Sequence, residues 1–317
     1  MAIHGFTLIG VPIQYEVSLP YRISTNLSID RPSENQLRRI KKYLSGFSDI
    51  EDFSTPFENI IVPKRLKDIG GLEVYFMDTL PLNKEDWRYS IVKFKSEQHL
   101  SFEHPSHELF NLDIASLISD KGLYLITSFL SRAQFGSKTE GYDHLQQIDN
   151  KSQEIILTKA DLATLKVLNS QVNKVEAEYP DIYHSLKLYK SLPRLVGYNE
   201  LLCLGLFSVI ESVLTHNPIS NVDSIGHQIR TKVKLLTNRF DRQPDYSKFG
   251  NIQSENLWKK LYDFRSKIAH GGKIDFNGSL QILTDAYEVQ LFLEHFLKIL
   301  LRGALNEPQL YTDLKAC

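Results

Sequence analysis

The sequence has little cysteine, no long apolar run and no marked excess of either charge. Only Cys203 and Cys317 occur in 317 residues, which excludes a disulfide framework and argues against a zinc site. No apolar run approaches the roughly 20 residues that span a bilayer, and no charged leader with an apolar core opens the chain. The net charge of −1 gives no global basic field. We therefore expect a reduced, cytoplasmic protein without a membrane segment, in which any nucleic-acid site is a local patch.

Motifs for cofactors and metals are also missing. The chain contains no GxxxxGK loop, no dinucleotide fingerprint and no GxSxG elbow. His99, His104 and His107 cluster, but their spacing fits no helical metal motif and Pro105 interrupts any regular face. We therefore expect no cofactor and no metal site.

The N-terminal half, residues 1–150, has the pattern of an α+β domain with a mainly antiparallel sheet. Short apolar stretches between Phe6 and Ile29 are broken by Pro12 and Pro20, which indicates strands and turns. Further strands are predicted at 59–62, 72–76, 87–94 and 123–126. The polar, glycine-bearing segment 135–152 is the best linker candidate.

One helix in this half is strongly basic on its outer side. Ser33 and Gln36 have the spacing of a capping box, which predicts a helix start. The basic residues that follow are Arg38, Arg39, Lys41 and Lys42. They form either a weak RNA-phosphate contact or an ordinary solvated face, and such runs are usually the latter.

The C-terminal half, residues 158–305, predicts an all-α up-and-down bundle, followed by a tail over 306–317. Thr158 and Asp161 indicate the first helix start, and apolar residues then recur at helical spacing. Later helices are expected at 181–192, 196–216, 224–240 and 279–301. Another helix, between the last two, is expected to end near His270. The helix over 196–216 is apolar nearly all round, so we expect it at the centre of the bundle.

The helix that ends near residue 270 carries the residues best suited to chemistry. Its apolar positions, from Leu257 to Ile268, fall four, three and four residues apart, and Gly271-Gly272 can end the helix in a left-handed conformation. Arg265 and His270 lie within this last part. A guanidinium binds phosphate by two parallel bonds, and an imidazole exchanges protons near neutral pH. The pair therefore suits phosphodiester chemistry.

The central apolar helix contains a narrow polar stripe. A carboxylate in such surroundings is costly unless it is paired. We expect Glu211 to hydrogen-bond Arg265 or His270 and to fix its orientation, and the alternative is that Glu211 reaches solvent at the end of the bundle. The stripe consists of Glu200, Ser208, Glu211 and Thr215.

The phrase LYDFRSKIAHGG, residues 261–272, resembles the signature of HEPN domains, in particular the Apea-like group. The segment 206–214, with its embedded glutamate, is also similar to a helix of that family, and the resemblance covers about 159–305. It implies a metal-independent endoribonuclease in which Arg265 and His270 of two protomers converge at a homodimer interface. The RNA 2′-hydroxyl would attack the adjacent phosphate and leave a 2′,3′-cyclic phosphate. The resemblance also suggests a bacterial anti-phage defence or toxin-like effector, with the N-terminal half sensing a phage-derived or protein trigger.

Several supporting residues and two alternatives accompany this hypothesis. Lys267, Lys273 and Tyr262 are candidates for holding RNA or the site, although they are equally ordinary surface residues. Ser266 stands where many nuclease members carry Asn, Asp or His, so it supplies no second titratable group. The first alternative is a catalytically inactive HEPN module that binds RNA or a protein partner. The second is a structural pair, in which His270 caps a helix and interacts with the macrodipole.

Overall fold

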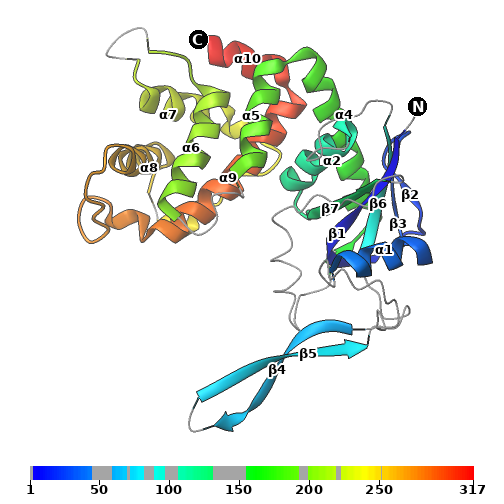
Figure 1. Ribbon diagram of the computed structural model, residues 1–317. Coiled ribbons are helices and arrows are strands. Elements are labelled where there is room, and N and C mark those ends of the chain that lie inside the picture. Colours follow the sequence, from blue (N-terminus) through cyan, green and yellow to red (C-terminus); the bar gives the residue numbers. More distant parts are fainter. Residues whose placement is uncertain are drawn as a thin grey trace. The chain divides into compact units, whose positions relative to one another are not determined.

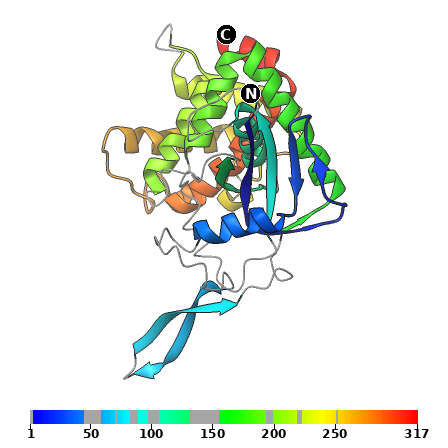
Figure 2. The ribbon, with the colours of Figure 1, turned by 45° about the vertical axis from the view of Figure 1, so that its right-hand side comes forward.

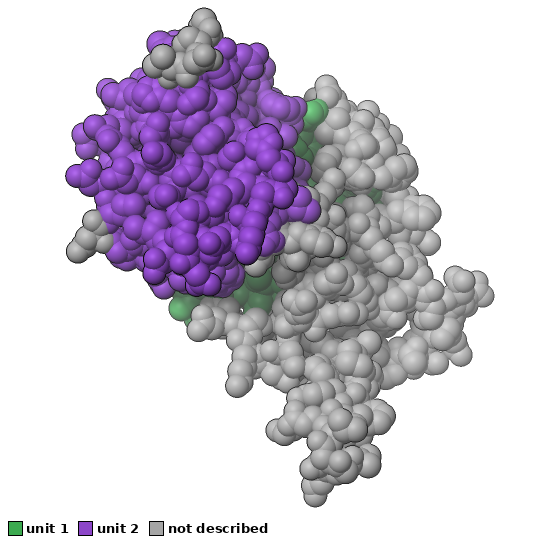
Figure 3. Space-filling model, turned by 90° about the vertical axis from the view of Figure 1, so that its left-hand side faces the viewer, with its two compact units in different colours: residues 1–116, 121–166 green, residues 117–120, 167–317 purple. Residues whose placement is uncertain are grey.

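The computed structural model describes residues 3–44, 59–69, 72–81, 89–96, 106–130, 155–192, 199–218, 223–250 and 252–317 (Figure 1). The chain forms two compact units, coloured separately in Figure 3. Unit 1 comprises Met1–Ser116 and Lys121–Lys166, and unit 2 comprises Leu117–Asp120 and Val167–Cys317. The predicted change from α+β to helical structure is confirmed, but the division falls inside a helix, later than the predicted linker.

Unit 1 is built on a mainly antiparallel sheet with the order β2-β3-β6-β1-β7. β1 pairs antiparallel with both β6 and β7, which confirms the predicted sheet type. A short parallel partner, β8, joins the far part of β1, and the sequence pattern did not predict it. The strands are β1 (Ile3–Tyr15), β2 (Tyr21–Arg22), β3 (Leu27–Asp30), β6 (Tyr89–Ser96), β7 (Leu125–Leu130) and β8 (Ile155–Leu157).

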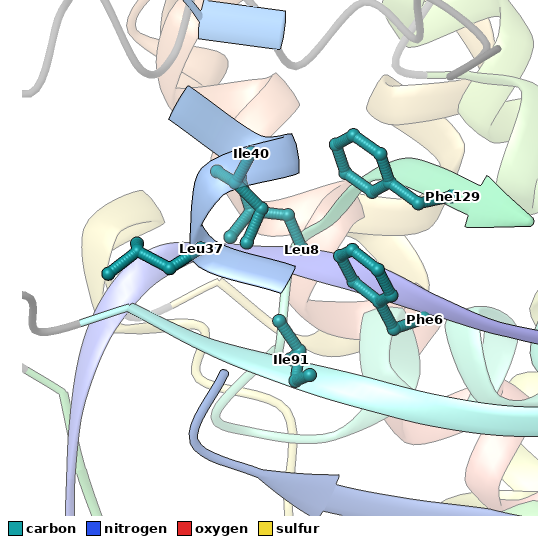
Figure 4. Close-up of a cluster of buried hydrophobic side chains, with 6 residues drawn as sticks. All are labelled: Phe6, Leu8, Leu37, Ile40, Ile91 and Phe129. Atoms are coloured by element: carbon teal, nitrogen blue, oxygen red, sulfur yellow. The ribbon is translucent and has the colours of Figure 1, made fainter. Parts of the chain in front are cut away.

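Helix α1 (Glu34–Leu44) runs across the strands on one face of this sheet (Figure 2). The capping box forms as predicted, since the Ser33 N–H donates to Gln36 Oε1 at 2.9 Å and the Gln36 N–H donates to Ser33 Oγ at 3.4 Å. Side chains of the helix and the sheet interdigitate in a buried apolar cluster (Figure 4). The cluster consists of Phe6, Leu8, Leu37, Ile40, Ile91 and Phe129.

The opposite face of the sheet is also buried. Thr7, Ile9 and Val92 alternate with the cluster residues along β1 and β6, and each is at most 2% exposed. Helix α2 (His107–Ile118) holds the β2–β3 hairpin through Glu108, which accepts hydrogen bonds from Ser24 Oγ at 3.1 Å and Asn26 Nδ2 at 2.7 Å. This end of the hairpin is therefore fixed by a charged anchor.

A second, two-stranded sheet belongs to the same unit. Strands β4 (Asn59–Ile69) and β5 (Leu72–Pro81) pair antiparallel, with a register shift between Leu66 and Ile69. Both strands are longer than the sequence pattern predicted (Figure 1).

In unit 2, α6 is the central helix, as predicted. It contacts α5, α7, α8, α9 and α10. Cys203 Sγ lies 3.7 Å from the carbonyl oxygen of Ala286, so α6 and α9 begin at the same end of the unit. The helices are α4 (Lys159–Glu178, which starts in unit 1), α5 (Pro180–Ser191), α6 (Asn199–Leu214), α7 (Ile225–Leu236), α8 (Ser254–Ala269), α9 (Ala286–Asn306) and α10 (Pro308–Ala316).

Two expectations for the end of the chain need correction. The last long helix starts at Ala286 and not near 279, because Asp285 is the N-cap and accepts from the Glu288 N–H at 2.9 Å. The segment expected to be a tail instead forms α10, which packs on α5, α6 and α9. Its Tyr311 is only 3% exposed, so burial of this ring accounts for the ordered end.

Arg302 of α9 explains why residues 117–120 belong to unit 2. Its side chain is 8% exposed, and Nε donates to Asp241 Oδ2 at 2.7 Å. Its Nη1 donates to Asp120 Oδ1 at 3.1 Å and to the Ile118 carbonyl at 3.3 Å.

Among the described helices, none is long and apolar enough to cross a membrane.

Candidate functional site

The predicted end of α8 is confirmed in atomic detail. Leu257, Leu261 and Phe264 are fully buried and anchor one face of the helix. His270 is the C-cap residue and Gly271 has a φ of 65°. The Gly272 N–H donates to the Lys267 carbonyl at 2.8 Å, and the Gly271 N–H donates to the Ile268 carbonyl at 3.2 Å. These two bonds form a Schellman motif, so the glycine pair stops the helix directly after His270.

Arg265 contacts Glu211, one of the two partners that the polar stripe predicted. Nη2 of Arg265 donates to Glu211 Oε2 at 3.0 Å. Nε lies 2.9 Å from Oε1, but its N–H is not aligned with that oxygen. The two side chains are 22% and 18% exposed, so α6 and α8 are joined by a half-buried ion pair. This contact fixes the direction of the guanidinium.

The Tyr262 ring packs against the same guanidinium. The Arg265 Cζ lies 5.7 Å from the centre of the Tyr262 ring, within the range of a cation–π contact. The other side of the ring packs on Gly226 of α7, where an added Cβ would lie 2.7 Å from Tyr262 Cδ1. The contact of Gly226 with Tyr262 was not predicted from the sequence. A glycine inside a helix lowers helix stability by about 1 kcal/mol and often has a packing reason, which was the available signal.

The electrostatics of this pair are dominated by burial. Burial raises the pKa of Glu211, and the attraction of Arg265 only partly opposes this change. Burial also raises the pKa of Tyr262, with Glu211 adding to the rise and Arg265 opposing it. Ionised Glu211 therefore compensates much of the Arg265 charge, but the pair does not offset the cost of removing the carboxylate from water.

His270 has a different environment. Its residue is exposed, and its imidazole makes no hydrogen bond or ion pair within the described ranges. Its backbone N–H donates to the Ser266 carbonyl at 3.1 Å. The Arg265 guanidinium contacts Glu211 and Tyr262, and no contact joins it to the His270 ring in this part of the chain. Arg265 and His270 are five positions apart in the sequence, and their side-chain groups have separate surroundings.

The remaining candidates on α8 and the following loop are peripheral. Lys267 Nζ donates to Ser279 Oγ at 2.7 Å in an exposed contact. Lys273 is exposed, and Ser266 contributes its carbonyl to the helix end. These residues border the site but take no part in the Arg265–Glu211 pair.

The basic residues of α1 are in unit 1, and Arg39 packs against the core. Its Cζ lies 5.4 Å and 5.6 Å from the ring centres of Phe6 and Phe129, and Nη2 donates to the Leu130 carbonyl at 2.7 Å. Burial lowers its pKa. Arg39 is therefore a packing residue, and an RNA phosphate would have to compete for its guanidinium.

The other basic residues of α1 give less information. Arg38 is exposed, as the solvated-face interpretation predicts. The side chains of Lys41 and Lys42 lie outside the described residues.

Within the polar stripe of α6, Glu211 is the member that pairs with a charge on α8. Thr215 Oγ1 donates to the Glu211 carbonyl at 2.8 Å, and Ser208 Oγ donates to the Leu204 carbonyl at 3.0 Å, which are contacts within the helix. Glu200 is exposed. The stripe therefore has one residue of interest and three ordinary polar residues.

No cluster of three or more His, Cys, Asp or Glu side chains suited to a metal occurs in the described ranges. His99 and His104 lie outside them. No family model matches the chain, and neither the curated proteins nor the solved structures include a significant match to it. The resemblance to HEPN domains therefore remains a prediction drawn from the sequence motif.

Proposed function

We propose that unit 2 is an endoribonuclease module of HEPN type that cleaves RNA without a metal ion. The observation that carries this proposal is the half-buried Arg265–Glu211 pair, with Nη2 to Oε2 at 3.0 Å, beside an exposed His270 at the end of the same helix. Preorganised cations stabilise charge that develops on a phosphate. An unengaged imidazole is available to move a proton.

In the proposed reaction the 2′-oxygen of a ribose attacks the adjacent phosphorus. The bond from O2′ to phosphorus forms, and the bond from phosphorus to the 5′-oxygen of the next nucleotide breaks. His270 moves the proton from the 2′-hydroxyl to the leaving 5′-oxygen, and Arg265 stabilises the negative charge on the phosphate oxygens. The products are a 2′,3′-cyclic phosphate and a 5′-hydroxyl. DNA lacks the attacking hydroxyl and is not cut.

Glu211 acts as a positioning residue in this scheme. A guanidinium has five N–H donors, and Arg265 donates from Nη2 to Glu211, while Nε faces the same carboxylate without an aligned hydrogen bond. The Nη1 donors remain available for a phosphate oxygen. Tyr262, wedged on Gly226, keeps the guanidinium plane in place while RNA binds.

Because Arg265 and His270 of one chain have separate surroundings, the proposed chemistry requires a second copy, as the resemblance to HEPN domains implies. We propose that two units 2 pair, so that His270 of one protomer serves a phosphate held by the Arg265 of the other. Exposed apolar side chains on α6 and α9 support such pairing, since Leu201, Tyr287 and Leu291 are 50%, 56% and 41% exposed. Sedimentation at micromolar concentration tests this point: a dimer is expected, and a monomer that still cuts RNA contradicts it.

On this proposal the protein is an anti-phage or toxin-like effector, and unit 1 senses a trigger or restrains the nuclease. The support for this biological role is the resemblance of residues 261–272 alone.

One observation favours a second candidate, a module that binds RNA or a protein without cutting. Glu211 already compensates the charge of Arg265, and Ser266 adds no titratable group next to it. Such a module would keep the shape of the site and lack the free cation that catalysis needs.

Cleavage of a 5′-labelled RNA in EDTA distinguishes the two candidates. The parent is compared with Arg265→Ala and His270→Ala, and with His184→Ala as a control that removes an exposed histidine from α5. Cutting by the parent and the control, lost in both site variants, supports the nuclease. RNA binding by the parent without cutting supports the binding module.

A further inference from the structure

A groove of about 420 Å³ lies in unit 1 beside the β2–β3 hairpin, and none of its lining residues belongs to the proposed nuclease site. Its volume is within the range of about 300–1,000 Å³ that is common for small-molecule sites. Four basic side chains line it: His4, Arg22, Lys93 and Lys95. The hairpin adds the polar side chains of Ser24, Thr25, Asn26 and Ser28.

The strand alternation explains why cations gather there. His4 is opposite Lys95 in the pairing of β1 with β6, and Phe6 is opposite Lys93. Residues two apart in a strand share a face, so these basic residues lie on the same face as Phe6 and Ile91, which α1 covers. The apolar face thus becomes basic where the cover of α1 ends.

Arg22 is held in a fixed orientation by the hairpin. Its Nε donates to the Ser24 carbonyl at 3.1 Å, and its Nη2 donates to the Thr25 carbonyl at 3.3 Å. Its Nη1 donates to no protein acceptor within the described residues. A guanidinium fixed by backbone carbonyls presents its remaining donors without further loss of side-chain entropy.

The charges of the groove do not cancel. Lys93 Nζ is paired with Asp30 Oδ2 at 2.6 Å. Glu108 accepts hydrogen bonds from the neutral side chains of Ser24 and Asn26 and remains a negative charge beside the hairpin. Lys95 and His4 are exposed and have no side-chain partner in the part of unit 1 that is described. Among the described residues, neither Arg22 nor Lys95 forms an ion pair, and the three cations Arg22, Lys93 and Lys95 outnumber the two carboxylates Asp30 and Glu108.

We propose that this groove binds the phosphate group of a small phosphate ester, for which a nucleoside monophosphate serves as the probe. Arginine, lysine, serine, threonine and asparagine side chains are the groups that most often contact phosphate oxygens in nucleic-acid complexes. The groove supplies them around Arg22 and Lys95, two cations with no ion pair among the described residues, which suits a phosphate monoester. Among the described residues that line it, Phe94 is the aromatic one and is 3% exposed, so binding rests on the phosphate and not on base stacking.

Isothermal titration calorimetry of the full chain with adenosine 5′-monophosphate tests the proposal. Adenosine and a ten-nucleotide RNA serve as the comparison ligands. The groove variant is Arg22→Gln with Lys95→Gln. The matched control, Lys159→Gln with Lys166→Gln, removes two exposed cations from α4 in the same chain. Lys95→Gln alone serves as a second variant, because Lys95 is exposed and its side chain makes no hydrogen bond or ion pair with the residues that the structure describes.

The monophosphate is expected to bind the parent and the control equally and to bind the groove variant at least about tenfold more weakly, because charged hydrogen bonds are lost. Lys95→Gln alone should show part of this loss, and adenosine should not bind. Equal weakening in the control pair overturns the proposal, as does binding of adenosine alone. Binding of the RNA through the groove without binding of the monophosphate overturns it as well and assigns the phosphate to a nucleic acid. None of these outcomes depends on RNA cleavage, so failure here is distinct from failure of the nuclease proposal.

Discussion

Replacing Arg265 by methionine should destabilise unit 2 in a pH-dependent way. The substitution keeps an apolar stem but leaves the Glu211 carboxylate, which is 18% exposed, without its cation. Removing one partner of a fully buried pair costs about 3–5 kcal/mol, and the partial exposure here places the value near 2–3 kcal/mol. Loss of the cation–π contact with Tyr262 contributes about 0.5–1 kcal/mol of this total.

The pH dependence follows from the raised pKa of Glu211. Burial favours the protonated acid in the folded state, so the stability that Glu211 contributes is full below the ordinary glutamate pKa of about 4.3 and is lost as pH rises through the folded value. Without Arg265 the pKa of Glu211 rises further. The penalty of Arg265→Met should therefore be larger at pH 7 than at pH 5.

Urea unfolding followed by tryptophan fluorescence measures this penalty directly. The chain has two tryptophans, and in a Trp87→Phe background the signal comes from Trp258, which is 1% exposed in α8. Arg239→Met is the matched control, because it removes an arginine from an exposed pair with Glu307 and should cost at most about 1 kcal/mol.

A thermodynamic cycle with Glu211→Gln completes the test. The double variant should cost less than the sum of the single variants by at least about 1 kcal/mol, because the two side chains interact directly. Additive penalties that are equal at pH 5 and pH 7 would refute the reasoning about this pair.

Three further predictions concern residues that stabilise unit 2. Arg302→Met should cost about 3–4 kcal/mol and lower the Tm by about 6–12 °C in calorimetry, since its side chain is 8% exposed and holds two carboxylates; an unchanged Tm would contradict the structure. Burial has the largest single effect and raises the pKa of Asp120, but the attraction and hydrogen bonds of Arg302 and Arg242 together outweigh it, so the net pKa is lowered. Its contribution should therefore be present above about pH 4 and lost on acidification, and Arg302→Met should flatten the acid limb of a stability–pH curve. Gly226→Ala should cost about 1–3 kcal/mol in urea unfolding, because its Cβ would lie 2.7 Å from the Tyr262 ring, whereas Gly272→Ala, with 3.5 Å to the nearest atom, should stay within about 0.5 kcal/mol.

The parts of the fold that local chemistry determines could be predicted from the sequence. Ser33 with Gln36 and Thr158 with Asp161 are reciprocal caps that need no distant partner, and both form. The two glycines after His270 likewise end α8 through bonds within the same turn. Hydrophobic periodicity was enough to predict α6 as the buried centre.

The parts that depend on tertiary contacts could not be predicted. Strand β8 has only three residues and exists because it pairs with β1. The final helix α10 depends on burial of Tyr311, and residues 117–120 join unit 2 through Arg302, more than 180 positions along the chain. A pattern read within a window of the sequence does not contain these partners.

The candidate site, like the fold, could be predicted only in part. The polar stripe on an apolar helix predicted that Glu211 bonds Arg265 or His270, with exposure to solvent as the alternative, and the structure pairs it with Arg265. The wedge of Tyr262 on Gly226 had no signal beyond a glycine inside a helix. The separation of the Arg265 and His270 heads follows from the Schellman turn and from Glu211 together, and spacing alone does not determine it.

The central claim is that Arg265 and His270 cut RNA by means of the 2′-hydroxyl. Its most direct test is mass spectrometry of the RNA ends produced by the full chain in EDTA, with a matched RNA that carries one 2′-deoxy nucleotide at the cut site. We expect 2′,3′-cyclic phosphate and 5′-hydroxyl ends from the parent protein. These ends should be absent with the His270→Gln variant and with the deoxy substrate. Cleavage of the deoxy position, or ends that persist in His270→Gln, would contradict it.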